Sequence, residues 1–203
     1  AHAANHLFVL IESIGLEYII KNLPSKELEN VGSCPFTFPL AEKRVDANEL
    51  SHLYYAKFLD SIVLSKPFLG KAAPNVVCEI GGGDGGLARI ILAKHKTKYI
   101  IIDLPEANML SSYYLALHFP GKKLFLYENY KSSGEKITNE IIKNHDLFIL
   151  PPGCKFEEDV KVGLFVNMRS MMEMEQRFVD EYFSFVHRHI SNAGVFANFN
   201  KLK

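Results

Sequence analysis

The chain has 203 residues, of which 48% are hydrophobic, and its 23 basic and 23 acidic side chains give a formal net charge of zero. This composition is sufficient for one substantial core, and it lacks the basic surface on which sequence-independent nucleic-acid binding depends. No stretch approaches the ~20 apolar residues that span a bilayer, and the start of the chain lacks the pattern of a signal peptide. Three cysteines, Cys34, Cys78 and Cys154, show no spacing typical of a disulfide framework or a zinc site. We therefore expect a cytoplasmic protein that acts on small molecules, with neither a nucleic acid nor a membrane as partner.

In the first third of the chain the sequence pattern predicts helices and no sheet. Apolar residues recur at helical spacing over residues 6–20 and again over residues 47–64, and the stretch between them contains Pro35 and Pro39 and is predicted to be irregular. Lys66-Pro67 and a linker over residues 70–74 are expected to end the second helix. We interpret residues 1–72 as a helical extension or lid and residues 73–203 as the main domain.

Strands and helices alternate from Asn75 onwards, which predicts parallel strands joined by crossover helices. The predicted strands cover residues 75–80, 98–103, 146–150, 163–167 and 195–199, with a further short strand possible at 124–127. The predicted helices cover residues 85–95, 105–118, 135–144 and 171–189. This pattern is typical of an α/β, Rossmann-like, doubly wound sheet of five parallel strands, in which ligands bind at the carboxyl ends of the strands.

A glycine turn follows the first of these strands. The run from Val76 to Leu92 predicts a buried strand, a turn with glycines at 81, 82, 83, 85 and 86, and a helix. Glycines allow a ligand to approach the backbone, and the helix start offers unpaired N–H groups. The next strand, residues 98–103, ends in Asp103, a carboxylate suited to a ribose diol. The two segments together predict a site for a ribonucleoside-containing cofactor.

Two cofactors fit this glycine spacing. Gly81-x-Gly83-x-x-Gly86 matches the dinucleotide fingerprint, whose loop holds a pyrophosphate. Glu79-x-Gly81-x-Gly83-x-Gly85 equally matches class I S-adenosylmethionine-dependent methyltransferases, which this segment resembles. A turn that binds nothing is a third interpretation.

Charge favours the methyltransferase interpretation over the dinucleotide one. Glu79 and Asp84 place negative charge where a pyrophosphate would be repelled and a cationic ligand attracted. We therefore expect a methyltransferase, and keep two alternatives: an NAD-dependent oxidoreductase, and a catalytically idle methyltransferase-like domain that serves as a binding module.

The glycine turn and three later motifs together resemble the sugar O-methyltransferases of bacterial polysaccharide gene clusters, over roughly residues 50 to 200. The later motifs are Ile102-Asp103-Leu104-Pro105, Phe165-Val166-Asn167-x-x-Ser170-Met171-x-Glu173-Met174 and Gly194-x-Phe196-x-x-x-Asn200. The resemblance implies S-adenosyl-L-methionine as cofactor and a hydroxyl of a sugar or glycan precursor as methyl acceptor. The cofactor-binding residues that it implies are Glu79, Gly81, Gly82, Gly83, Asp84, Gly85, Asp103, Leu104, Leu150 and Asn167. Among them, Asp103 is expected to face the ribose, Leu104 and Leu150 the adenine, and Asn167, with Ser170, the place where the methyl group meets its acceptor.

Methyl transfer to a hydroxyl requires positioning and a base. Glu173 is the first candidate base, with Ser170 beside it, but Ser170-x-x-Glu173 also matches a helix capping box, which is the more ordinary interpretation. His52, on the second predicted helix, is the alternative base, although a single helical histidine more often packs. We expect no metal ion, because no cluster of carboxylates converges in the sequence.

The acceptor itself leaves little trace in the sequence. Tyr54 and Tyr55 are candidates to stack on a sugar ring, or else to pack in the interior. The methyltransferase fold adds an antiparallel strand pair after its fifth strand, and these residues offer no segment for it. We therefore expect either a piece of a longer protein or a sheet edge covered by a partner, and a homo-oligomer is one possibility.

Overall fold

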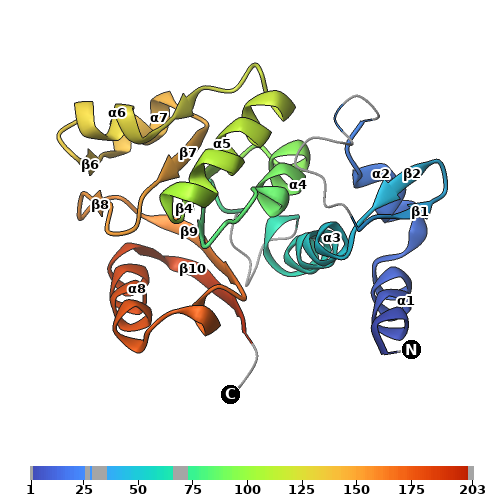
Figure 1. Ribbon diagram of the computed structural model, residues 1–203. Helices are drawn as coiled ribbons and strands as arrows, with labels where there is room; N and C mark the ends of the chain where they lie inside the picture. Colours follow the sequence, from blue (N-terminus) through green and yellow to red (C-terminus); the bar gives the residue numbers. More distant parts are fainter. Residues whose placement is uncertain (1, 26–27, 29–35, 66–72, 201–203) are drawn as a thin grey trace.

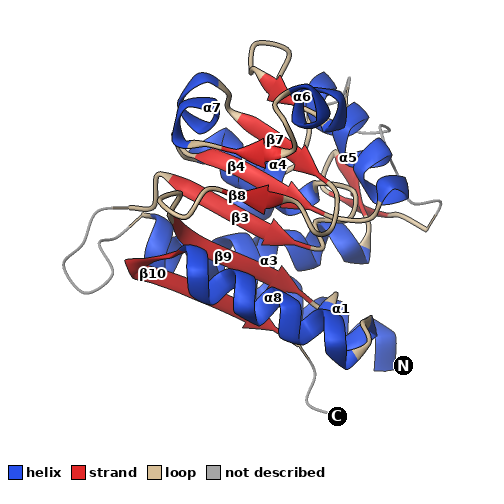
Figure 2. Cartoon of the chain, turned by 90° about the vertical axis from the view of Figure 1, so that its left-hand side faces the viewer, coloured by secondary structure: helices blue, strands red, loops and turns tan. Residues whose placement is uncertain are grey.

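The computed structural model describes residues 2–25, 28, 36–65 and 73–200, and its centre is a six-stranded sheet. The strand order is β10-β9-β3-β4-β7-β5, and every neighbouring pair is parallel (Figure 2). The strands are β3 (Val76–Ile80), β4 (Lys98–Ile102), β5 (Leu124–Phe125), β7 (Leu147–Leu150), β9 (Val162–Met168) and β10 (Ile190–Phe199). The predicted Rossmann-like α/β fold is confirmed, with β5 as a sixth strand in addition to the five expected.

The topology places a switch point between β3 and β9. From β3 the chain moves outward to β4 and then to β5 and β7, and it afterwards returns to the other side of β3 to form β9. Loops therefore leave the carboxyl ends of β3 and β9 in opposite directions, and ligands of open α/β sheets bind at such a point. Figure 1 looks onto this carboxyl edge of the sheet.

Helices cover both faces of the sheet (Figure 1). One face packs against α3 (Ala47–Leu59), α4 (Gly86–Lys94) and α5 (Pro105–His118), and the other against α6 (Tyr127–Ser132), α7 (Asn139–Asn144) and α8 (Gln176–His189). Successive residues of β4 alternate between the two cores, with Ile101 in the first and Ile102 in the second. Such strands, buried on both faces, explain the continuous apolar runs in the sequence.

The N-terminal region differs from the prediction in two places. The helix expected over residues 6–20 is interrupted at Gly15, whose φ of 82° ends α1 (His2–Ile14) before α2 (Leu16–Asn22) begins. The stretch expected to be irregular contains an antiparallel hairpin of β1 (Phe38–Leu40) and β2 (Lys43–Val45). The helix expected over residues 47–64 is present, since α3 continues into a π-helical turn at Asp60–Leu64. Lys66-Pro67, most of the predicted linker and Cys34 lie outside the described residues.

A largely buried ion pair joins the N-terminal helices to the sheet domain. Arg89 of α4 contacts Glu49 of α3 at 2.5 Å and donates a second hydrogen bond, 2.9 Å long, to the carbonyl of Asn22 at the end of α2. Burial raises the pKa of Glu49, and the Arg89 guanidinium opposes this shift. Because a buried charge that loses its partner is costly, this pair fixes α2 and α3 against α4.

Two predicted helices are shorter than expected. The segment 135–144 begins with β6 (Lys136–Ile137), which pairs with β8 (Lys155–Phe156), and only then forms α7. The segment 171–189 is a 3₁₀ turn, Met171–Glu173, followed by α8, because Met174 and Glu175 have extended backbone. Among the helices of the described residues, none is both long and apolar enough to cross a membrane.

Candidate functional site

The glycine loop between β3 and α4 lies at the switch point. Gly81, Gly83 and Gly85 have φ angles of 75°, 55° and 86°, a region that residues with a β-carbon rarely adopt. A β-carbon on Gly81 would lie 2.1 Å from Ser170 Oγ, whereas one on Gly83 would meet no atom within 4 Å. The loop therefore requires glycine for its backbone shape, and it leaves open space in front of Gly83.

Asp103 lies beside this loop, as the sequence predicts. Its Oδ2 accepts a 2.7 Å hydrogen bond from the Gly83 N–H, and its Oδ1 accepts one of 2.7 Å from the Leu104 N–H. The Asn108 amide donates to the carbonyls of Asp103 and Leu150, at 2.7 and 2.9 Å, which fixes the end of β4 against the end of β7. Since each carboxylate oxygen has a second lone pair, Asp103 can still accept hydrogen bonds from two hydroxyl groups.

Glu79 is a buried carboxyl group beneath the loop. It is 1% exposed, and its Oε2 accepts a 2.8 Å hydrogen bond from the Tyr99 hydroxyl, while its Oε1 has no partner in the described part of the chain. The pKa of Glu79 is raised to about 8, chiefly by burial; the hydrogen bond from Tyr99 lowers this pKa, and the charges of Asp84 and Asp103 raise it. An unpaired buried oxygen and a shifted pKa together are typical of a ligand site.

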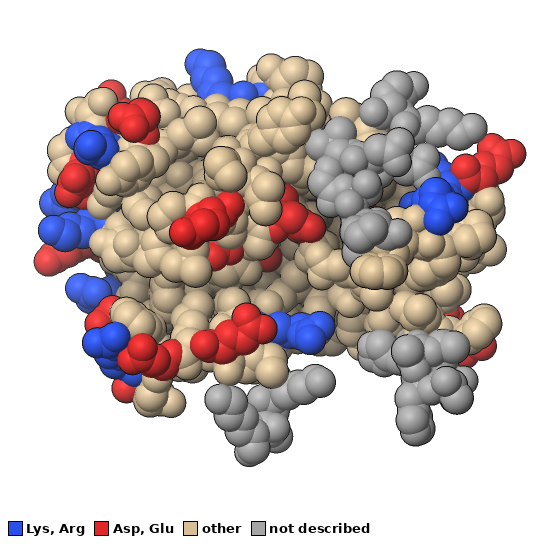
Figure 3. Space-filling model, in the orientation of Figure 1, with Lys and Arg blue, Asp and Glu red and all other residues tan. Residues whose placement is uncertain are grey.

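Asp84 occupies the N-terminus of α4. Its Oδ1 accepts a 2.9 Å hydrogen bond from the Gly86 N–H, and its Oδ2 accepts one of 3.3 Å from Asn48. A pyrophosphate bound at a helix N-terminus uses the same N–H groups, so this carboxylate competes with it both for hydrogen bonds and through charge. Figure 3 shows acidic side chains around a hollow in the middle of the carboxyl edge, with basic side chains mostly at the margins.

His52 packs against the far end of the loop. It is 7% exposed, and a β-carbon on Gly86 would lie 2.2 Å from its Nδ1. The structure thus brings Ser170 to Gly81 at the start of the loop and His52 to Gly86 at its end. Ser170 and His52 therefore contact different glycines of the loop, and the tight contact with Gly86 gives His52 a packing role.

This packing role predicts the behaviour of Gly86→Ala. We expect the substitution to destabilise the fold by about 1–3 kcal/mol, because the new methyl group overlaps the imidazole. In the double variant with His52→Ala most of that cost should disappear, and Gly121→Ala, where a β-carbon meets no atom within 4 Å, is the control. Urea unfolding of the four proteins of the cycle measures the coupling. Additive effects of the two substitutions would contradict the contact.

Asn167 is the centre of a hydrogen-bonded cluster that closes the switch point. It is fully buried, and its amide nitrogen donates to the Ile80 carbonyl at 2.7 Å and to Ser170 Oγ. Its Oδ1 accepts hydrogen bonds from the Asn200 amide at 2.9 Å and the Met171 N–H at 3.4 Å, and Ser170 Oγ donates to the Ile80 carbonyl at 3.1 Å. Because protein groups satisfy this amide, Asn167 holds β9 against β3 and positions Ser170 on the loop.

The capping box predicted for Ser170 and Glu173 is wrong. The residues from Met171 to Glu173 form only a 3₁₀ turn, and Ser170 makes no side-chain cap hydrogen bond, because its hydroxyl is bound to Ile80. The Glu173 side chain is exposed at the carboxyl edge. Its role as a base stays a prediction.

The two leucines expected near an adenine differ in environment. Leu104 is 60% exposed at the start of α5, whereas the Leu150 side chain is fully buried in the core. Only the backbone carbonyl of Leu150 reaches the Asp103 loop, where it accepts hydrogen bonds from the Asp103 N–H and Asn108.

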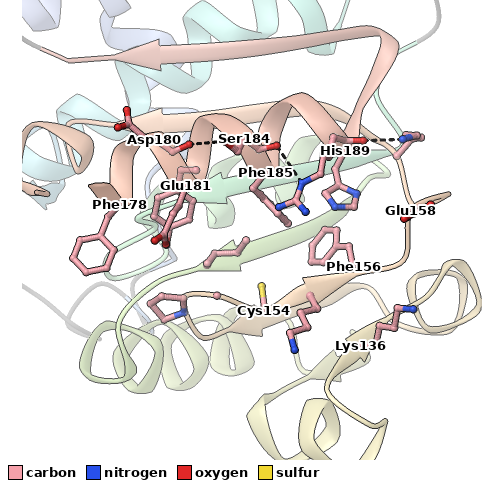
Figure 4. Close-up of a pocket in the computed structure, with 17 residues that line it drawn as sticks. Lys136, Cys154, Phe156, Glu158, Phe178, Asp180, Glu181, Ser184, Phe185 and His189 are labelled. Carbon is pink, nitrogen blue, oxygen red and sulfur yellow. Dashed lines mark hydrogen bonds between the residues drawn. The ribbon is translucent and has the colours of Figure 1, made fainter. Parts of the chain in front are cut away.

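A cavity of about 1230 Å³ extends from this edge along α8 (Figure 4). Its lining includes Ile102, which directly precedes Asp103, Pro152 and Gly153 after β7, and the rings of Phe156 and Phe185. Tyr182 also lines the cavity, and burial raises the pKa of its hydroxyl. The cavity thus reaches the residue that precedes Asp103, and aromatic side chains form part of its wall.

Sequence reasoning missed the partners that hold the site. Tyr99, Asn108 and α8 are absent from the predicted set, because their contacts depend on register and helix placement. Asn200, in the last of the sequence motifs, was the one signal of the cluster around Asn167. Its amide nitrogen donates to Asn167, and its Oδ1 accepts a 3.2 Å hydrogen bond from the Met172 N–H. No group of three or more His, Cys, Asp or Glu side chains in the described ranges is arranged to hold a metal ion.

Comparison with known proteins adds little to this geometry. No family model matches the chain, and no curated protein sequence matches it. Among solved structures, it is similar to one described as the mitomycin 7-O-methyltransferase MmcR, with 12% identity and a TM-score of 0.43 over 77% of this chain. The chain spans 40% of the length of that protein.

Proposed function

We propose that this chain is an S-adenosylmethionine-dependent O-methyltransferase that methylates a hydroxyl of a sugar or glycan precursor in the cytoplasm. The observation that carries the proposal is the contact between Asp103 and the Gly83 N–H, on a left-handed glycine loop at the switch point. The open space before Gly83 and the unpaired oxygen of Glu79 suit a cofactor that carries both a ribose diol and positive charge. When bound, S-adenosylmethionine supplies a methyl group on a sulfonium.

The residues of the chain would divide the remaining tasks. Asp103 would hold the ribose hydroxyls, Glu79 and Asp84 would favour the cationic end, and the Asn167 cluster would fix the edge against which the acceptor is held. Glu173, exposed beside Ser170, is the candidate to take the acceptor's proton. The sugar acceptor rests on the sequence resemblance alone.

An NAD-dependent oxidoreductase is less consistent with the same site. Asp84 already accepts the Gly86 N–H at the start of α4, where a pyrophosphate would bind. Thermal-shift titration with S-adenosylmethionine, S-adenosylhomocysteine and NAD separates these functions. We expect the first two to raise the unfolding midpoint and NAD to leave it unchanged. A shift with NAD alone would overturn the proposal, and the absence of any shift would favour an idle binding module.

Asp103→Ala tests the ribose contact directly. We expect S-adenosylhomocysteine to bind about 10- to 150-fold more weakly, which corresponds to about 1.5–3 kcal/mol for hydrogen bonds to a charged group. Asp146→Ala is the matched control, since Asp146 bonds to Lys98 and the Lys123 N–H at the opposite edge of the sheet. Isothermal titration calorimetry measures both constants. Equal affinity in the wild type and Asp103→Ala would remove Asp103 from the site.

A further inference from the structure

Arg169 has an unusual backbone conformation directly after β9. Its φ angle is 66°, in the left-handed region that disfavours a β-carbon. The other described non-glycine residues with positive φ are Ala41, between β1 and β2, and Glu135, directly before β6. The Arg169 N–H donates a 2.9 Å hydrogen bond to the Phe199 carbonyl, which holds the conformation.

The neighbours of Arg169 place it at the glycine loop. Ser170, the next residue, bonds to the Ile80 carbonyl and lies where a β-carbon of Gly81 would be. The Arg169 side chain is exposed, and it makes no ion pair or hydrogen bond with the part of the chain that the structure describes. In the segments that follow β3, β4, β7 and β9, residues 81–85, 103–104, 151–154 and 169–170, it is the one basic side chain.

Aromatic side chains of α3 pack against Phe199, the residue whose carbonyl accepts the Arg169 hydrogen bond. The ring of Phe199 lies 4.7 Å from that of Tyr55 and 5.6 Å from that of Phe58, and Tyr55 meets Tyr54 edge to face at 5.7 Å. Tyr54 is 38% exposed. The backbone hydrogen bond from Arg169 to Phe199 attaches this basic residue to the aromatic group. A few polar groups beside apolar surface are what small-molecule sites use.

We propose that Arg169 determines acceptor specificity by pairing with an oxyanion, a carboxylate or phosphate, on the acceptor. The methyl acceptor is then an acidic sugar derivative and not a neutral one, an inference that rests on the proposed methyltransferase function. The carboxylates of this edge repel an anion, and Arg169 supplies the local counter-charge. Its planar guanidinium suits a carboxylate or phosphate through two parallel hydrogen bonds.

The test measures acceptor binding to protein saturated with S-adenosylhomocysteine. Glucuronate, glucose 6-phosphate and glucose are titrated separately, with saturation-transfer NMR as the readout. We expect at least one anion to bind tenfold or more tightly than glucose, and the order of the two anions identifies the preferred oxyanion. Arg169→Gln should abolish the preference and Arg169→Lys should retain part of it.

The variants Arg169→Asn and Arg169→Gly separate the effect of the backbone conformation at this position from the effect of the arginine charge. Both residues tolerate positive φ, so these variants should unfold at the same or a higher urea concentration than the wild type and still lose the preference. Equal binding of anions and glucose by the wild type, including no binding of any, overturns the inference, as does a preference that persists in Arg169→Gln. Binding of S-adenosylhomocysteine is measured first, since its failure contradicts the proposed function itself.

Discussion

Replacing Gly81 by Ala is expected to destabilise the protein by roughly 2–5 kcal/mol and to abolish cofactor binding. The left-handed backbone costs a residue with a β-carbon about 1–2 kcal/mol. The new methyl group would also lie 2.1 Å from Ser170 Oγ, in a cluster whose atoms are fixed by Asn167 and Ile80, so overpacking adds about 1–3 kcal/mol. Thermal unfolding should report this as a fall of about 2–4 °C per kcal/mol.

Gly83→Ala is the matched variant for this experiment. Gly83 has a positive φ of 55°, but its β-carbon would meet nothing within 4 Å, so only the backbone strain of about 1–2 kcal/mol applies. Its methyl group would project into the open space in which we propose that the cofactor binds. We expect Gly83→Ala to lose affinity for S-adenosylhomocysteine by more than its stability loss explains. If Gly81→Ala is no less stable than Gly83→Ala, the contact with Ser170 does not constrain the loop.

The sheet could be predicted from the sequence because its strands are buried on both faces. Runs such as Tyr99 to Ile102 are continuously apolar and too short for a helix, and glycines or prolines mark the ends of several such runs. The range 105–118 predicted for one helix coincides with α5, which Pro105 starts. The short strands β6 and β8 could not be predicted from the sequence. Each has two residues and forms only because it pairs with the other.

The site could be predicted in its positions but not in its bonds. The last residues of all the parallel strands lie at the carboxyl edge of the sheet. The sequence could therefore predict that Glu79, Asp103 and Asn167 lie near one another. Which hydrogen bonds they make depends on register: β3 pairs Glu79 with Ile101, and this brings Tyr99 onto the same face, two residues away. The Ser-x-x-Glu spacing of Ser170 and Glu173 misled for the same reason, because the carbonyl of Ile80, distant in sequence, competes for the serine hydroxyl.

Glu79→Gln is expected to remove a strong pH dependence of stability. The carboxyl pKa is raised from 4.5 to about 8 in the folded protein, so the unfolded chain loses this proton at lower pH than the folded one does. The stability contributed by Glu79 is therefore fully present below pH ~4.5 and is lost as pH rises to about 8, by up to about 5 kcal/mol in total. Urea unfolding at several pH values should show this decline in the wild type and not in Glu79→Gln.

Tyr99→Phe sharpens the same experiment. The Tyr99 hydroxyl donates to Glu79 and lowers the pKa of that carboxyl, so its removal should raise the pKa and extend the decline to higher pH. A wild-type profile that is flat between pH 5 and 8 would show that Glu79 ionises normally.

The protonation of Glu79 should also couple to the cofactor. A cationic ligand near the loop favours the ionised carboxylate, so binding should release a proton, and affinity should increase as pH rises from 6 to 8. Because the ligand has ionisable groups of its own, the informative quantity is the ratio of wild-type to Glu79→Gln affinity for S-adenosylmethionine at each pH. That ratio should rise with pH. For a pyrophosphate ligand it should fall, because an anion favours the neutral acid, so the sign of this slope distinguishes a methyltransferase site from a dinucleotide site without an acceptor being known.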